Sequence, residues 1–214
     1  MNTLISKNIL DIIPTLYYNK NIDTLEKIIF KSRELLKNLN NIEKIILYQT
    51  DLSYTNSLQI IELILIMHGI WDKDYDFNKK EIQQKKELFE IYLKDSLPSE
   101  HMSIIFNVIN NIFNNQKLNP KYNIIRDIVL DTIYLEMLSF ETIDRIILNN
   151  ENTDIHKLII KRCKEDFFNL KEKLTTSYAK EAGSVLEKQL KLIVLDTDFL
   201  DNHINTRKAF LGIK

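Results

Sequence analysis

The sequence is poor in the residues that interrupt helices. Its 214 residues include only 3 glycines and 3 prolines. Since glycine supplies tight turns and proline ends helices, this scarcity argues against a fold of many short strands and hairpins. The abundant leucine, lysine and glutamate favour helices instead. The composition therefore predicts an all-α protein. We expect one helical domain over residues 1–214, because no stretch has the composition of an interdomain linker.

The sequence also has little net charge and almost no cysteine. Its 29 basic and 30 acidic residues give a formal net charge of -1. No global field then draws the protein to nucleic acid or to an acidic membrane, and we predict neither as a partner. Cys163 is the only cysteine, so an internal disulfide is excluded. The N-terminus lacks the regions of a signal peptide, and we expect a cytoplasmic protein.

Long apolar runs are few, and the clearest one extends from Leu58 to Ile70. Only Gln59, Glu62 and His68 are strongly polar within it. A helix here would be apolar nearly all round, which is typical of a helix buried in a core. The run is too short and too interrupted to span a membrane. We expect the rest of the chain to be organised around this helix.

Further helices follow from apolar residues at helical spacing. A second largely apolar helix is expected over residues 124–148, with a break near Ser139. The other predicted helices cover residues 5–17, with a kink at Pro14, then 23–39, 81–94, 99–114, 154–170 and 176 to about 203. Ser99 is the expected N-cap of one, and Thr175 or Thr176 of the last. In that last helix the inward residues are expected to be Ala179, Ala182, Val185, Leu186 and Leu190, and its small residues imply close helix packing.

Four segments carry a resemblance to a known family. In chain order they are Ile64-Leu65-Ile66-Met67-His68-Gly69-Ile70, Leu97-Pro98-Ser99-Glu100, Ile128-Val129-Leu130-Asp131-Thr132-Ile133-Tyr134-Leu135-Glu136, and Asp166-Phe167-Phe168-Asn169-Leu170 followed by Leu174-Thr175-Thr176. Together they resemble the HD superfamily of metal-dependent phosphohydrolases, in particular its small single-domain bacterial members. The resemblance covers about residues 20–200. It implies an HD-domain-like helical bundle.

The resemblance also identifies two remnants of a metal site. Family members hold a divalent metal with a first His, an adjacent His-Asp pair and a later Asp, and the metal activates a water that attacks phosphorus. His68 and Asp131 match two of these positions, which implies that they converge as relict metal ligands. Gly69 replaces the paired aspartate, and the segment 23–27 has no histidine. Arg145 falls where an arginine is common, whereas Asp166 replaces a lysine.

Several of these residues have alternative readings. His68 is either a relict ligand or a histidine hydrogen-bonded at the end of a core helix. Asp131 is either a relict ligand or a carboxylate that meets a lysine or a helix N-terminus. Asp23, Glu26, Asp72, Asp74 and Asp76 either supply replacement carboxylates for a hard cation or form solvated faces. Tyr17, Tyr18, Trp71, Tyr75 and Phe77 either stack on a nucleotide or pack at a rim. His101, His156 and His203 lie in charged surface contexts without a functional signal, and Cys163 is expected to be a packing residue.

Three functions are compatible with this pattern. The first is a catalytically silent HD-like protein without a cofactor, acting as a binding or regulatory module for a small phosphorylated ligand or a protein partner. The second is a metal-dependent phosphohydrolase that acts on a nucleotide or another phosphate ester. It would use Mg²⁺ or Mn²⁺ in a reworked site built from His68, Asp131 and nearby carboxylates. The third is a helical adaptor unrelated to the family. We expect the first, because two ligands do not hold and activate a metal.

Overall fold

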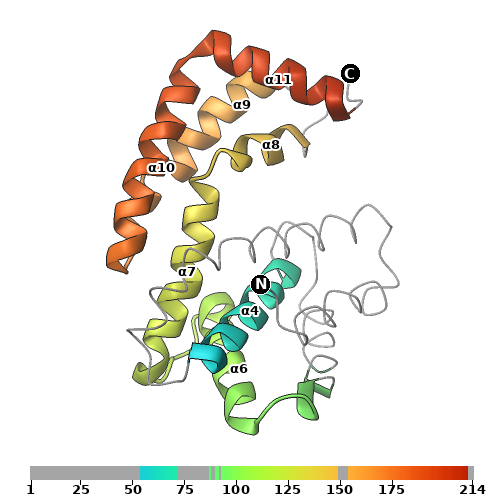
Figure 1. The fold of residues 1–214 in the computed structure, drawn as a ribbon, viewed down its shortest axis with the longest axis vertical. Coiled ribbons are helices and arrows are strands. Elements are labelled where there is room, and N and C mark those ends of the chain that lie inside the picture. Colours follow the sequence, from blue (N-terminus) through green and yellow to red (C-terminus); the bar gives the residue numbers. More distant parts are fainter. Residues whose placement is uncertain (1–53, 72–86, 88–89, 92, 149–153, 212–214) are drawn as a thin grey trace. The chain divides into compact units, whose positions relative to one another are not determined.

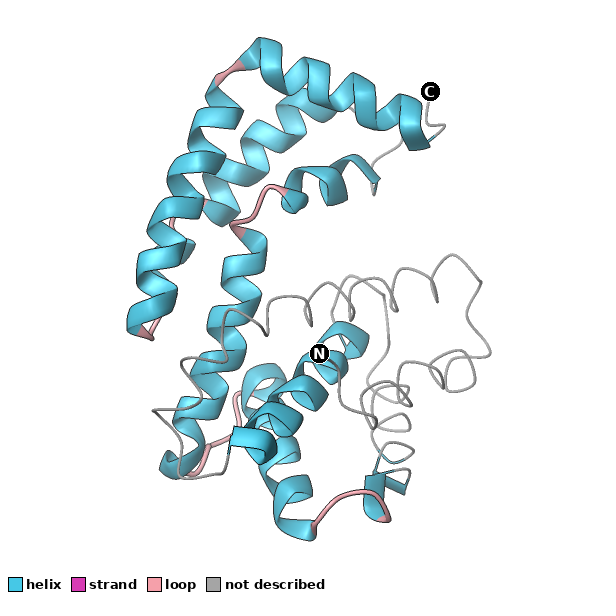
Figure 2. Cartoon of the chain, viewed as in Figure 1, coloured by secondary structure: helices cyan, strands magenta, loops and turns pink. Residues whose placement is uncertain are grey.

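The regular structure is helical throughout the part of the chain that the structure describes. This computed structural model describes residues 54–71, 87, 90–91, 93–148 and 154–211. Within them lie seven α-helices and no strand (Figures 1 and 2). These helices are α4 (Tyr54–Trp71), α6 (Ser99–Asn114), α7 (Asn123–Met137), α8 (Glu141–Leu148), α9 (Ile155–Arg162), α10 (Ser177–Leu195) and α11 (Thr197–Leu211). The predicted all-α fold is confirmed.

The chain divides into two compact units, residues 1–129 and residues 130–214. The first contains α4 and α6, the second contains α8 to α11, and α7 crosses the boundary. The expectation of one domain over residues 1–214 stays a prediction. None of the described helices is long and apolar enough to span a membrane.

The first unit is built on the helix that the apolar run predicted. All side chains from Ile60 to Met67 are buried, Glu62 among them, so α4 is enclosed on every side as expected. It packs against α6, whose apolar stripe of Ile104, Ile105, Val108 and Ile109 is buried. The predicted cap of α6 is wrong. Ser99 is already helical, and Pro98 occupies the cap position without a side-chain hydrogen bond.

The break predicted near Ser139 is present, because α7 ends at Met137 and α8 begins at Glu141. Side chains bond the carbonyl groups that the end of α7 leaves without helical partners. The Ser139 hydroxyl donates to the Glu136 carbonyl at 2.6 Å, and the Thr142 hydroxyl donates to the Met137 carbonyl at 2.9 Å. The polar residues that end this helix therefore also stabilise its end.

Two helices that were predicted as continuous are divided. The segment expected as a helix over 154–170 comprises α9, a π-helical turn at Cys163–Phe167 and a 3₁₀ turn at Leu170–Lys173. The helix expected from 176 to about 203 is α10 and α11, separated at Asp196. The backbone of Asp196 is extended, and its carboxylate accepts a 3.0 Å hydrogen bond from the Phe199 N–H. This cap at the start of α11 is more favourable than an aspartate inside a longer helix.

The core of the second unit draws on each helix from α7 to α11. Its members include Leu138, Ile143, Ile159, Leu190 and Leu200. Gly183 lies at a close approach, because a β-carbon there would overlap Leu174 Cδ1 and stand 3.6 Å from methyl carbons of Leu135 and Leu138. The close packing predicted from the small residues of α10 is confirmed at this point. Val185, expected to point inward, is instead 53% exposed.

Candidate functional site

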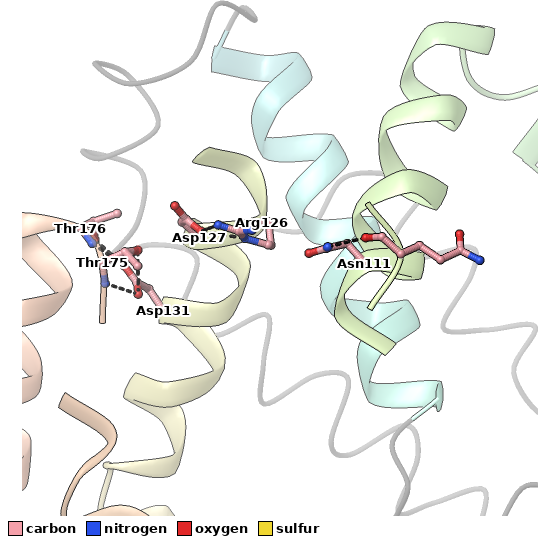
Figure 3. A network of polar contacts seen from close by, with 7 residues as sticks. Asn111, Arg126, Asp127, Asp131, Thr175 and Thr176 are labelled. Atoms are coloured by element: carbon pink, nitrogen blue, oxygen red, sulfur yellow. Dashed lines mark hydrogen bonds and ion pairs between the residues drawn. The ribbon is translucent and has the colours of Figure 1, made fainter. Parts of the chain in front are cut away.

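Asp131 is the predicted site residue whose surroundings the structure describes in full. It lies in α7 and is only 1% exposed. Its carboxylate meets the segment that precedes α10, and Figure 3 shows dashed lines that join its side chain to Thr175 and Thr176. The Thr175 N–H donates to Oδ1 and the Thr176 N–H donates to Oδ2, each at 2.9 Å. The Thr176 hydroxyl donates to Oδ2 at 2.7 Å, and the Thr175 hydroxyl lies 3.2 Å from both oxygens.

These contacts place a carboxylate at the N-terminus of a 19-residue helix. Thr176 is the N-cap of α10, with its hydroxyl accepting a hydrogen bond from the Ala179 N–H at 3.3 Å, so the predicted cap is confirmed. The N-terminus of a helix carries a partial positive charge, which favours a carboxylate. A carboxylate offers about four lone-pair positions, and four or more donor contacts converge on Asp131 here. The contacts of Asp131 therefore agree with the alternative in which its carboxylate meets a helix N-terminus.

Tyr134 lies close to Asp131 along α7. Burial, followed by the negative charge of Asp131, raises the pKa of the Tyr134 hydroxyl above its usual range. The ammonium group of Lys173 lies 5.8 Å from the centre of the Tyr134 ring. The raised pKa keeps the Tyr134 phenol neutral beside the carboxylate.

The described part of the structure does not include the side chains of the other predicted metal ligands. His68 belongs to α4, and its side chain lies outside the described part, as do Asp23, Glu26, Asp72, Asp74 and Asp76. The predicted convergence of His68 and Asp131 thus stays a prediction. Of the aromatic residues proposed for stacking, Trp71 ends α4 without a described side chain, and Tyr17, Tyr18, Tyr75 and Phe77 fall outside the described ranges. Among the described residues no three His, Cys, Asp or Glu side chains gather as a metal site requires.

Arg145 and Asp166, two positions noted from the family resemblance, have structural partners. The Arg145 guanidinium forms an ion pair with Glu136, which is 5% exposed, and also donates to the Glu136 carbonyl at 3.1 Å and the Thr142 hydroxyl at 2.8 Å. It thereby stabilises the end of α7. Asp166 is exposed and forms an ion pair with Arg162 at 2.8 Å.

The histidines differ from the surface residues that the sequence indicated. His101 is only 8% exposed in the first turn of α6, so the prediction of a surface context is wrong for it. Its Nδ1 atom has no hydrogen-bond partner among the residues that the structure describes. His156 pairs with Asp201 at 2.6 Å. His203 contacts Asp144 at 2.7 Å. The residue type of His101 suggested exposure. Only its position on the same helix face as the apolar residues indicates that it is buried.

Two polar clusters in the second unit were missed by the sequence reasoning. Asp144 binds both His203 and Arg207 of α11. Burial alone would raise the pKa of Asp144, but the bonds from Arg207 and then His203 hold it below its usual range. Glu187 is 2% exposed and is bound by Lys171 at 2.7 Å and Lys191 at 2.6 Å. Only the Glu187–Lys191 pair, four residues apart on one helix, carried a signal in the sequence.

Described residues of each unit line an open groove. In the first unit a groove of about 450 Å³ is lined by residues on both sides of Pro98, including Ile91, Lys94, Met102 and Phe106. In the second unit a groove of about 260 Å³ is lined by Leu138, Phe140, Leu186, Gln189, Leu190, Leu192 and Ile193. Neither groove is lined by Asp131. The second is apolar except for Gln189, so its surface suits an apolar side chain more than a phosphate.

Comparison of the chain with known protein families, characterised proteins and solved structures gives no match in any of the three.

Proposed function

We propose that this chain is a catalytically silent, HD-like helical protein that acts as a binding or regulatory module. One observation carries the proposal: the carboxylate of Asp131 is already bound on both oxygens by Thr175 and Thr176. A metal ion at Asp131 would have to compete with these donors and with the partial positive charge at the start of α10. The buried carboxylate is therefore suited to holding α7 and α10 together.

The sequence around His68, the other predicted ligand, supports the same proposal. Gly69 provides no carboxylate beside His68. Divalent metals in enzymes are held by three or more protein ligands in a defined geometry, and that enclosure lowers the pKa of the bound water. One imidazole and one engaged carboxylate would leave most of the coordination shell to exchangeable water. The ligand of the module would be a small phosphorylated compound or a protein, and its proposed location is the cytoplasm.

The test combines metal content with a phosphatase screen. We expect the purified full chain to carry no stoichiometric divalent metal and to release no phosphate from nucleotides or other phosphate esters when Mg²⁺ or Mn²⁺ is added. Asp131→Asn should lower the thermal stability by the same amount with and without these metals. Asp127→Asn is the matched control, because Asp127 lies one turn earlier on α7 and pairs with Arg126 instead.

A contrary result is equally specific. Stoichiometric metal that is lost in His68→Ala, together with metal-dependent phosphate release, would favour the phosphohydrolase with a reworked site. A positive search for ligands would use thermal shift with a set of phosphorylated metabolites. Stabilisation in the absence of divalent metal would support the binding module, since a ligand that binds only the folded state raises its stability.

A further inference from the structure

The second unit exposes a concentration of large apolar side chains along one helix and the start of the next. Val185, Leu192 and Leu195 of α10 are 53%, 70% and 71% exposed, and Phe199 of α11 is 48% exposed. These residues, together with the exposed Lys188 and Asp196, are called the α10 seam below. Exposed apolar patches of this kind mark interaction sites more often than isolated exposed residues do.

The spacing within the seam specifies the kind of partner. Residues 185, 188, 192 and 195 follow one another at intervals of three and four positions. This is the repeat by which one α-helix packs along another in a coiled coil. The apolar groove of about 260 Å³ lies beside the seam and includes Leu192 in its lining. The seam thus presents protruding side chains and a recess on the same surface.

We propose that α10 pairs in antiparallel orientation with α10 of a second copy of this chain, about a two-fold axis that passes beside Leu192. A two-fold contact uses the same patch on both copies, so the patch must complement itself. A seam that carries both protruding leucines and a recess meets this condition.

The charges select the orientation. Parallel pairing in register would place Lys188 against Lys188 of the second copy, which is unfavourable. In antiparallel pairing about Leu192, the residue four positions before Leu192 in one copy lies opposite the residue four positions after Leu192 in the other copy. Lys188 then faces Asp196 of the second copy, and this ion pair occurs twice. Asp196 remains exposed while its Oδ1 atom caps α11.

The same register places the other exposed apolar residues of α10 along the contact. Leu192 lies against its own counterpart at the axis. Leu195 lies one turn after the axis and Val185 two turns before it, on the same face of the helix. Phe199 belongs to α11, which begins after the break at Asp196, so the α10 register does not place it.

Disulfide crosslinking tests the register. Leu192→Cys places two thiols at the axis, within the reach of about 7 Å between α-carbons that a disulfide needs. Cys163 does not interfere, because it is fully buried and its thiol has a pKa of about 12. We expect mild oxidation to give a covalent dimer. Glu181→Cys is the matched control: this exposed position on α10 lies far from its counterpart in the proposed register and should stay uncrosslinked.

Sedimentation equilibrium of the full chain tests the affinity. We expect a concentration-dependent dimer whose dissociation constant rises about tenfold or more in Leu192→Glu, as for a central interface residue. Lys188→Glu should weaken the dimer because it faces Asp196, and adding Asp196→Asn should recover part of the loss while keeping the cap. Lys180→Glu changes the same charge on α10 outside the seam and should have no effect. Circular dichroism checks that each variant is folded.

Three outcomes would overturn the proposal. One is a wild-type chain that remains monomeric at the highest concentration tested. Another is equal crosslinking of Leu192→Cys and Glu181→Cys, which would indicate random collision. A dimer that Leu192→Glu leaves intact would also reject it, because the contact would then lie on another surface.

Discussion

The carboxylate of Asp131 and the hydroxyl of Thr176 lie 2.7 Å apart, although 45 positions of sequence separate the two residues. The contact joins the middle of α7 to the N-cap of α10, and both side chains are buried. Thr176 donates its proton to Asp131 and accepts from the Ala179 N–H, so one hydroxyl serves two elements at once. The carboxylate thereby completes the N-cap of a long helix through a tertiary contact.

Replacing Thr176 should therefore destabilise the second unit more than replacing its neighbour does. Thr176→Val removes the hydrogen bond to Asp131 and the cap of α10, at an expected cost of about 1 to 2 kcal/mol. Thr175→Val keeps the backbone donor and removes only contacts of 3.2 Å from an exposed residue, so its cost should be about 0.5 kcal/mol or less. Urea unfolding of both variants measures the difference. Equal losses would mean that the cap is not the source of the stability.

The sequence predicted the parts of this arrangement, because each has a local signal. The threonine pair before an apolar pattern indicated a helix start, and the apolar residues around Asp131 indicated a buried helix. Their contact left no local trace, since the two segments are far apart in the chain. The resemblance to the HD family implied that Asp131 is a relict metal ligand, and that implication stays a prediction. The bonds to Thr175 and Thr176 show what the carboxylate contacts in the folded chain.

The helices α4 and α7 should respond strongly to loss of side-chain volume. Leu65 and Ile128 are both 0% exposed. Leu65→Ala or Ile128→Ala should each cost about 2 to 5 kcal/mol, because a cavity remains where the side chain is removed. Ile91→Ala is the control, since Ile91 is 69% exposed. Denaturant unfolding decides the matter, and losses below about 0.5 kcal/mol at both buried positions would contradict the assignment of these helices to the core.

Helix boundaries were predicted less well than helix existence, and Asp196 shows why. The apolar pattern continues past it from Leu195 to Phe199, so periodicity alone favours one helix. The competing signal is an aspartate whose carboxylate bonds the Phe199 N–H, and this bond begins α11. The prediction that Val185 points inward was wrong for a related reason. Its place on an apolar helix suggested burial, but the interior is occupied by Leu190, Val194 and Ala179 instead.

The buried carboxylate of Glu187 should make stability depend on pH. Burial alone would raise its pKa, but the bonds from Lys171 and Lys191 outweigh burial and hold the pKa of Glu187 below its ordinary 4.5. A lowered pKa in the folded state contributes stability above the unfolded value, and that contribution is lost as the pH falls through the folded value. Glu187→Gln should therefore cost about 1 to 2 kcal/mol near neutral pH, and this cost should shrink below about pH 4.5.

Urea titrations of the wild type and Glu187→Gln at neutral and acidic pH measure this dependence. Glu181→Gln is the matched control, because Glu181 is exposed on the same helix. A cost that stays constant from neutral to acidic pH would show that Glu187 contributes through packing alone.

Cys163 should be chemically silent in the folded protein. Its side chain is fully buried in the core of the second unit. Burial, and then the charge of Asp166, raises the pKa of the thiol from 9.0 to about 12. Since the thiolate is the reactive form, a shift of three pKa units lowers its population about a thousandfold. Labelling with a thiol reagent at mildly alkaline pH should therefore be slower by at least this factor in the native chain than in urea. Labelling at the unfolded rate without denaturant would place Cys163 at the surface and contradict the packing of the π-helical turn against α10.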